Sequence, residues 1–139
     1  MTFEDLKLHN SLQKAVKDQN YETPTSIQAK AIPLILDRND VLGTAQTGTG
    51  KTAAFSLPIL HHLENESQNQ GKRKVRALIV TPTRELAIQI AENFTDYSKY
   101  NSIKNTVIYG GVKQMKQVKR LDAGVDVLIA TPGRLLDLI

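Results

Sequence analysis

Four short apolar runs rich in β-branched residues predict buried strands. They span residues 41–45, 77–81, 106–109 and 125–130. Between these runs, apolar residues recur at helical spacing, as at Leu86, Ile90 and Phe94 and again at Met115, Val118 and Leu121. Strands that alternate with helices build a parallel sheet with helices on its faces. The pattern therefore predicts an α/β fold.

A helical segment is expected ahead of the first predicted strand. Ser11 is placed to cap a helix that reaches about Asn20. Thr25 is placed to cap a second helix, which Pro33 is expected to interrupt or restart. The polar stretch 65–74, NESQNQGKRK, predicts a surface loop with solvated charges. No internal repeat or domain boundary is visible, so we expect one domain.

Each predicted strand is followed by a turn of small residues with glycine or proline. These turns read TAQTGTGKT, TPTREL, YGGV and TPGRL. In an open α/β sheet, ligands bind outside the carboxyl ends of the strands, where helix N-termini present free N–H groups. A single turn of this kind also occurs without a ligand. Four of them at one edge favour a binding surface.

The first of these turns, AQTGTGKT at residues 45–52, predicts a phosphate-binding loop. Glycines at 48 and 50 let backbone N–H groups approach phosphate oxygens. Lys51 supplies a positive charge for the terminal phosphates, and the Thr52 hydroxyl is placed to ligate Mg²⁺. Ala45 stands where the general pattern has glycine, and the alternative is a merely flexible loop.

Composition narrows the class of protein only a little. The chain has 139 residues, no cysteine, and 18 Lys and Arg against 14 Asp and Glu, for a formal net charge of +4. This mild excess favours polyanions without identifying one. A disulfide scaffold is excluded, and no apolar stretch approaches the ~18 residues of a membrane span. We expect a soluble, cytoplasmic protein.

Several motifs in order carry a resemblance to a known family. The segment YETPTSIQ (21–28) precedes the phosphate loop, and PTRELA (82–87), GG (110–111) and TPGR (131–134) follow it. This set resembles the N-terminal RecA-like domain of the DEAD-box RNA helicases, in which Ala45 is the family's own variant. The resemblance implies a partial RecA-like P-loop NTPase domain, incomplete at its C-terminal side, with residues 1–36 as the Q-motif region and 37–139 as the P-loop α/β core.

The resemblance also implies a nucleotide site for ATP with Mg²⁺. Its residues are Tyr21, Gln28, Ala45, Gln46, Thr47, Gly48, Thr49, Gly50, Lys51 and Thr52, with Lys51 and Thr52 as the catalytic residues and Thr52 on the metal. An amide such as Gln28 offers one donor and one acceptor to the adenine edge, which guanine does not match. Tyr21 lies where the family stacks an aromatic ring on adenine. Asn20 replaces a common glycine, and asparagine tolerates the left-handed backbone.

The later motifs resemble the family's contacts to the RNA backbone. The implied residues are Pro82, Thr83, Arg84, Glu85, Gly110, Gly111, Thr131, Pro132, Gly133 and Arg134. Helix N-termini, glycine N–H groups and the two arginines suit phosphate, so binding should be independent of base sequence. Glu85 also suits the first turn of a helix for purely structural reasons. Lys113, Lys116, Lys119 and Arg120 are expected to be only the solvated side of a helix.

The acids that hydrolysis requires are not found in the expected places. A Mg²⁺ shell in this class of site needs a carboxylate at the end of a neighbouring strand. No predicted strand ends in one, and Asp40 and Asp126 stand at strand starts, on the opposite edge. By resemblance, the Asp-Glu-Ala-Asp motif and a second RecA-like domain would follow beyond Ile139.

Three interpretations of the function remain open from the sequence alone. The chain is the N-terminal part of a helicase that couples ATP hydrolysis to local RNA duplex unwinding, or a nucleotide- and RNA-binding module without turnover, or a member of another P-loop class. The spacing of Tyr21 and Gln28 speaks against the third. Without the following strands, a sheet edge is expected to be open, which predicts lower stability or self-association of the fragment.

Overall fold

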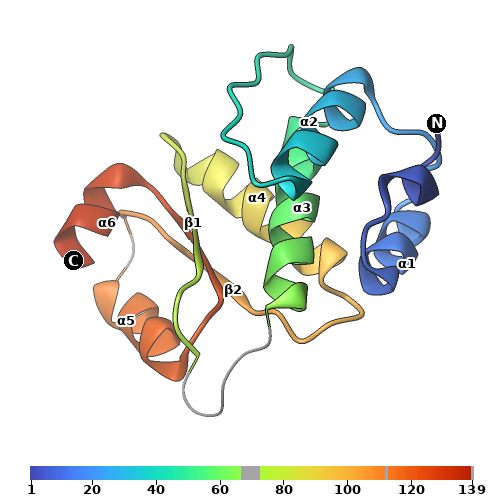
Figure 1. Ribbon diagram of the computed structural model, residues 1–139. Coiled ribbons are helices and arrows are strands. Elements are labelled where there is room, and N and C mark those ends of the chain that lie inside the picture. The colour runs from blue at the N-terminus through green and yellow to red at the C-terminus, as the bar shows by residue number, and fades with distance from the viewer. Residues whose placement is uncertain (67–72, 112, 139) are drawn as a thin grey trace. The chain divides into compact units, whose positions relative to one another are not determined.

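The computed structural model describes residues 1–66, 73–111 and 113–138 (Figure 1). It divides into two compact units, which we treat separately. Residues 1–66 and 96–102 form the helical unit, and residues 67–95 and 103–139 form the sheet unit. Among the described residues, no helix is long and apolar enough to cross a membrane.

The helical unit consists of a short 3-10 helix and three α-helices. They are η1 (Phe3–Leu6), α1 (Asn10–Asp18), α2 (Ser26–Leu36) and α3 (Lys51–Asn65). The helices bury one apolar stripe each, with Leu12 and Val16 on α1, Ile32 on α2, and Leu57 and Leu60 on α3. Helices α2 and α3 pack against each other. This packing places the start of α2 beside the start of α3.

Two local predictions for these helices were wrong. Helix α1 begins at Asn10 with His9 as its N-cap, and the Ser11 hydroxyl donates instead to the Glu64 carboxylate at 2.6 and 2.8 Å. Helix α2 continues through Pro33 to Leu36. The proline ring removes only its own N–H, and its carbonyl still accepts from the N–H of Asp37 at 3.1 Å. The predicted cap at Thr25 is confirmed.

The first predicted strand is also wrong. Residues 41–45 have no strand pairing in the structure, and Leu42 is 95% exposed. An extended segment becomes a strand only when a neighbouring strand accepts from its N–H groups and donates to its C=O groups. None of the strands described pairs with this segment. The predicted loop at 65–74 lies mostly outside the described residues, and Asn65 is the last residue of α3.

The other three predicted strands are confirmed as a parallel sheet in the sheet unit. They are β1 (Ala77–Val80), β2 (Asn105–Ile108) and β3 (Val127–Ala130), in the order β1-β3-β2. Leu78 pairs with Leu128, and Thr106 pairs with Leu128 from the other side. The connecting helices are α4 (Arg84–Tyr97), α5 (Gln114–Ala123) and α6 (Pro132–Leu138). The predicted α/β fold is thereby confirmed.

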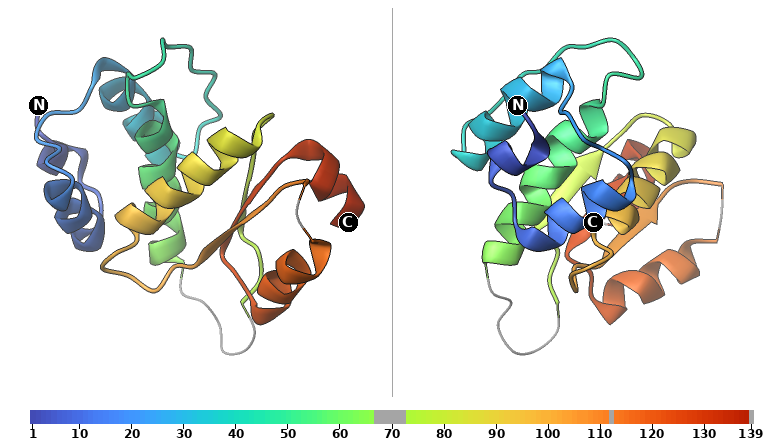
Figure 2. Two further views of the ribbon diagram at one scale, coloured as in Figure 1. Left: turned by 180° about the vertical axis from the view of Figure 1, so that it is seen from behind. Right: turned by 90° about the vertical axis from the view of Figure 1, so that its right-hand side faces the viewer.

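Helices cover the two faces of this sheet unequally. Helices α5 and α6 pack on one face, where Leu121, Leu135 and Leu138 contact a cluster of Ile108, Leu128 and Ala130. Helix α4 lies on the other face (Figures 1 and 2). The same face that α5 and α6 cover continues onto β1, where Leu78 and Val80 are exposed. Strand β1 is therefore an open edge and not the fully buried strand that its composition predicts.

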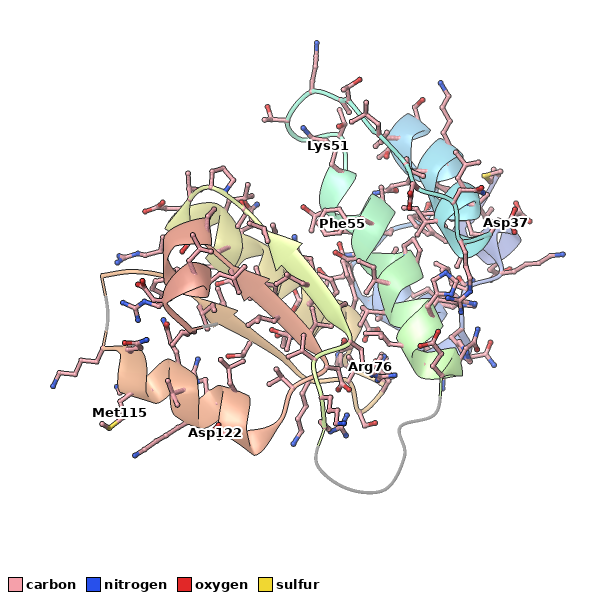
Figure 3. All side chains as sticks on the ribbon, turned by 60° about the vertical axis from the view of Figure 1, so that its left-hand side comes forward. Asp37, Lys51, Phe55, Arg76, Met115 and Asp122 are labelled. Atoms are coloured by element: carbon pink, nitrogen blue, oxygen red, sulfur yellow. The ribbon has the colours of Figure 1, made fainter. Side chains whose placement is uncertain are left out.

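The helical periodicity was right for α4 and α5, but the buried positions differ from the predicted ones. On α4 the buried stripe is Ala87, Ile90, Phe94 and Tyr97, whereas Leu86 is exposed. On α5 Met115 is 68% exposed and its side chain points away from the strands (Figure 3). The buried residue of α5 is Gln117.

Asp126 organises the amino end of the sheet, as its place at a strand start predicts. Its fully buried carboxylate accepts from Arg73 at 2.7 Å, from Arg76 at 2.9 Å and from the Lys104 N–H at 2.9 Å. Its backbone carbonyl accepts the N–H groups of Arg76 and Ala77. This residue fixes the entries of all three strands, on the edge opposite to the predicted ligand edge.

Candidate functional site

Four of the ten predicted nucleotide residues line a pocket in the helical unit, whereas the other six are not among its lining residues, namely Ala45, Gln46, Thr47, Thr49, Lys51 and Thr52. The pocket has a volume of about 520 Å³, and its lining includes Tyr21, Gln28, Gly48 and Gly50 together with Phe3 and Thr25. The segment before α2, the start of α2 and the loop before α3 each contribute to it. Segments that lie far apart in the sequence are thus brought to one cavity.

Gln28 is held firmly at this pocket. Its side chain is only 4% exposed, its amide oxygen accepts from the Thr25 N–H at 3.0 Å, and its amide nitrogen donates to the Gly50 carbonyl at 3.2 Å. Thr25 and Gln28 also form the capping box that starts α2. Each of these bonds uses one of the two hydrogen-bonding positions on its atom, so the amide retains capacity for one donor and one acceptor contact.

The glycines of the loop are required for two different reasons. Gly48 and Gly50 both have positive φ angles, of 79° and 82°, which side chains disfavour. A Cβ atom on Gly50 would lie 2.2 Å from the Gln28 amide nitrogen, whereas a Cβ atom on Gly48 would contact nothing within 4 Å. Gly50 therefore allows the loop to close onto Gln28.

Lys51 and Thr52 begin α3 directly after Gly50 (Figure 3). The Lys51 ammonium donates to the Ala45 carbonyl at 2.7 Å, across the turn that lies between them. Thr49 donates to the Gln46 carbonyl at 2.6 Å, which closes the same turn. Lys51 is exposed and Thr52 is half-buried. The loop is thus folded into a compact turn at the N-terminus of a 15-residue helix.

Two further aromatic residues fix the position of Tyr21. Its ring stacks on Phe3 with centroids 6.0 Å apart, and its hydroxyl lies 3.1 Å from that of Tyr97. Burial raises the pKa of Tyr97, and the hydrogen bond with Tyr21 adds to the effect. Asn20 has a φ of 62°, which confirms the predicted left-handed turn. Phe3 itself is buried.

The predicted RNA-contacting residues lie in the sheet unit, after the carboxyl ends of its strands. Arg84 begins α4 and places its guanidinium over the Tyr109 ring, 5.4 Å from the centroid. Gly111 has a φ of 85°, and a Cβ atom there would lie 3.3 Å from an Arg84 nitrogen. The turn after β2 thus approaches the first residue of α4.

The remaining members of this set flank the same strand ends. The Thr83 hydroxyl accepts from the Leu86 N–H at 3.2 Å and caps α4, and Glu85 lies exposed in its first turn. Pro132 is the first residue of α6, where its missing N–H costs nothing. Thr131 and Arg134 are half-buried, and four other members are exposed, namely Pro82, Gly110, Pro132 and Gly133.

Sequence reasoning missed Gln117, which links two of the predicted turns. This residue is 4% exposed, donates from its amide to the Tyr109 carbonyl at 3.0 Å and accepts from Arg134 at 3.1 Å. It therefore ties the turn after β2 to the turn after β3. Its signal in the sequence was weak, because Gln117 is a polar residue between the apolar Met115 and Val118 and does not continue their helical spacing.

Carboxylates are absent from the last positions of the described strands. The residues that follow β1, β2 and β3 are Thr81, Tyr109 and Thr131. Within the described ranges, no group of three His, Cys, Asp or Glu side chains could hold a metal ion.

Comparison with known proteins agrees with the sequence motifs. The family described as DEAD/DEAH box helicase matches residues 25–139. The chain is 42% identical to DEAD-box ATP-dependent RNA helicase 24 of Arabidopsis thaliana, 45% to the ATP-dependent RNA helicase CshA of Limosilactobacillus reuteri and 47% to the ATP-dependent RNA helicase DeaD of Escherichia coli. These alignments cover 98 to 99% of this chain but 18, 27 and 21% of those proteins. The chain therefore belongs to the DEAD/DEAH box helicase family.

Proposed function

We propose that this chain is the ATP- and RNA-binding part of a DEAD-box ATP-dependent RNA helicase, in which ATP binding and hydrolysis are coupled to local RNA duplex unwinding. The pocket that gathers Tyr21, Gln28, Gly48 and Gly50 carries the proposal. The relatives named above are ATP-dependent RNA helicases. Residues 1–36 would act as the Q-motif region and residues 37–139 as the P-loop core.

In this proposal the helical unit holds the nucleotide. The remaining donor and acceptor of the Gln28 amide read the adenine edge, and Tyr21 provides a ring for stacking. The turn from Ala45 to Gly50 surrounds the phosphates, and Lys51 exchanges the Ala45 carbonyl for a phosphate oxygen. Thr52 ligates the Mg²⁺ that accompanies ATP, and this ion supplies charge neutralisation at the phosphates.

The sheet unit is proposed to hold single-stranded RNA by its backbone. Arg84 and Arg134 supply charge-assisted contacts to phosphates, and the turns at Gly110, Gly111 and Gly133 let the strand approach closely. Neither arginine needs to read a base edge, so affinity should depend on salt and little on sequence.

Hydrolysis and unwinding are proposed for the whole protein, with a second RecA-like domain as partner. One observation favours a narrower alternative for these residues by themselves, namely a nucleotide- and RNA-binding module without turnover. Asp126, the carboxylate buried in the sheet unit, is engaged by Arg73 and Arg76 at the amino edge of the strands. It cannot serve a Mg²⁺ shell without breaking these ion pairs.

Calorimetric titration of ADP and of ATP with Mg²⁺ into the chain tests the nucleotide site. Lys51→Ala should weaken ATP binding at least about tenfold, because it removes the charge that faces the phosphates, whereas Lys30→Ala, which removes an exposed cation on α2, should leave binding unchanged. Gln28→Ala should reduce the preference for ATP over GTP, and Gln89→Ala serves as its exposed control. Equal binding of ATP and GTP by the parent chain would instead support another P-loop class.

Phosphate release with and without RNA separates the two forms of the proposal. Release near background, with ATP still bound, would assign these residues to a binding module. Robust RNA-stimulated release would show that the carboxylates for hydrolysis are supplied within this chain, contrary to the arrangement of its strand ends.

A further inference from the structure

A second pocket of the sheet unit lies between β2 and α5, and the predicted RNA contacts do not account for it. It has a volume of about 470 Å³. Three cations line it, Lys113 just before α5 and Lys116 and Arg120 on α5, together with Val107, Tyr109 and Gly111. The buried amide of Gln117 also contributes.

The cations of this pocket share one side of the helix. Lys113, Lys116 and Arg120 follow one another at steps of three and four residues, which places their side chains on a common face. Like charges at such spacing repel and weaken a helix. No ion pair within the described residues joins an acidic side chain to any of the three. An anion in the pocket would relieve this repulsion.

Lys119 differs from the other three cations because it lies outside the pocket. It is exposed on the same helix and carries the same charge, but it does not line the pocket. All four cations are exposed, as expected of the solvated side of a helix, and Lys113, Lys116 and Arg120 also line the pocket.

The pocket is continuous with the proposed RNA contacts. Tyr109 and Gly111 line it, and the Tyr109 ring carries the Arg84 guanidinium. Gln117 hydrogen-bonds both the Tyr109 carbonyl and Arg134. A strand bound at Arg84 and Gly111 thus has the pocket directly beside it.

We propose that this α5 pocket is an additional subsite for the RNA backbone, which binds phosphodiester groups next to the turn at Gly111. The inference rests on the proposed RNA binding and extends it. Lysine ammonium groups act as mobile point charges, and the Arg120 guanidinium is a planar fork that matches phosphate oxygens. The subsite therefore adds affinity and salt dependence without adding sequence preference.

The test measures binding of a fluorescein-labelled oligouridine to the full chain by anisotropy over a range of salt concentrations. The subsite variant is Lys116→Ala with Arg120→Ala. The matched control is Lys74→Ala with Lys119→Ala, which removes the same charge from exposed positions of the sheet unit outside the pocket. Alanine is the best helix former, so the α5 substitutions should not unfold the helix, and circular dichroism verifies this.

The subsite variant should bind about tenfold or more weakly at low salt, and its log–log salt slope should be shallower by about 0.7 for each phosphate that the subsite no longer neutralises. The control should follow the parent closely. Equal reductions in the two variants would overturn the subsite, because net charge alone would explain them. If the subsite variant bound oligouridine as the parent does while Arg84→Ala bound it more weakly, the subsite would be overturned and the proposed function retained. Absence of RNA binding by the parent would overturn both.

Discussion

Gly50→Ala is the substitution that most sharply tests how the proposed phosphate loop is held. The change adds two separate costs. A non-glycine residue in the left-handed region costs about 1–2 kcal/mol, and Gly50 has a φ of 82°. The new Cβ atom would also lie 2.2 Å from the Gln28 amide nitrogen and 3.1 Å from its amide carbon. Gln28 must therefore move, since the glycine carbonyl that it contacts is part of the backbone.

The second cost follows from the hydrogen bonds that Gln28 would give up. It donates to the Gly50 carbonyl and accepts from the Thr25 N–H, and each such bond contributes about 1 kcal/mol net. We therefore expect Gly50→Ala to lower the free energy of unfolding by about 3–4 kcal/mol. Gly48→Ala should cost only about 1–2 kcal/mol, because its φ is similar but nothing lies within 4 Å of its Cβ position.

Urea unfolding of the single and double variants measures these contributions. In the Gln28→Ala background, Gly50→Ala should cost only about as much as Gly48→Ala, which gives a coupling energy of about 1–2 kcal/mol between positions 28 and 50. ATP binding should be abolished in Gly50→Ala and retained more fully in Gly48→Ala. Additive effects at 28 and 50 would refute the contact between the loop and the Gln28 amide.

Three further outcomes are expected. Asp126→Asn should lower the free energy of unfolding by about 3–5 kcal/mol, because it breaks a buried ion pair. The control Asp122→Asn, at an exposed position, should change it by less than about 0.5 kcal/mol. Urea unfolding measures both variants. Burial lowers the pKa of His61 below its ordinary value of 6.5, and the charges of His9 and His62 lower it further while Glu64 opposes them. The unfolded chain then binds this proton more readily, so stability should be level above about pH 6.5 and fall below it, and His61→Gln should flatten the profile of thermal unfolding against pH. Gln117→Leu should weaken oligouridine binding about fivefold or more by freeing the turn after β2 from Arg134, while the exposed Gln114→Leu binds as the parent does.

Sequence reasoning succeeded where residue type alone determines local geometry. Thr25 with Gln28 three residues later is a capping pattern, and the structure contains that cap. The three strands of the sheet are separated by whole helices, so a parallel arrangement was expected and is found. The turns after the strands were equally visible, because glycine and proline mark the places where a strand passes into a helix.

Sequence reasoning failed where the structure of a segment depends on a partner that is distant in the sequence. Residues 41–45 have the composition of a strand, but no described strand pairs with their backbone. Composition likewise predicted that β1 is buried, whereas Leu78 and Val80 are exposed because α5 and α6 cover only β2 and β3. The apolar pattern reports the capacity to be buried, and tertiary neighbours decide whether burial occurs.

Helix α5 shows how such a failure can point toward a site. Its apolar residues Met115 and Val118 face outward, while the amide of Gln117 is buried and the cations of the same helix line a pocket. Leu121 packs against the strands, but the exposure of Met115 and Val118 forgoes some hydrophobic stabilisation. The hydrogen bonds of Gln117 to Tyr109 and Arg134 offset part of that cost. These hydrogen bonds hold together the two turns that Gln117 joins, and both turns belong to the proposed RNA surface. A buried amide that joins two turns of the proposed RNA surface is therefore evidence that α5 serves that surface as well as the core.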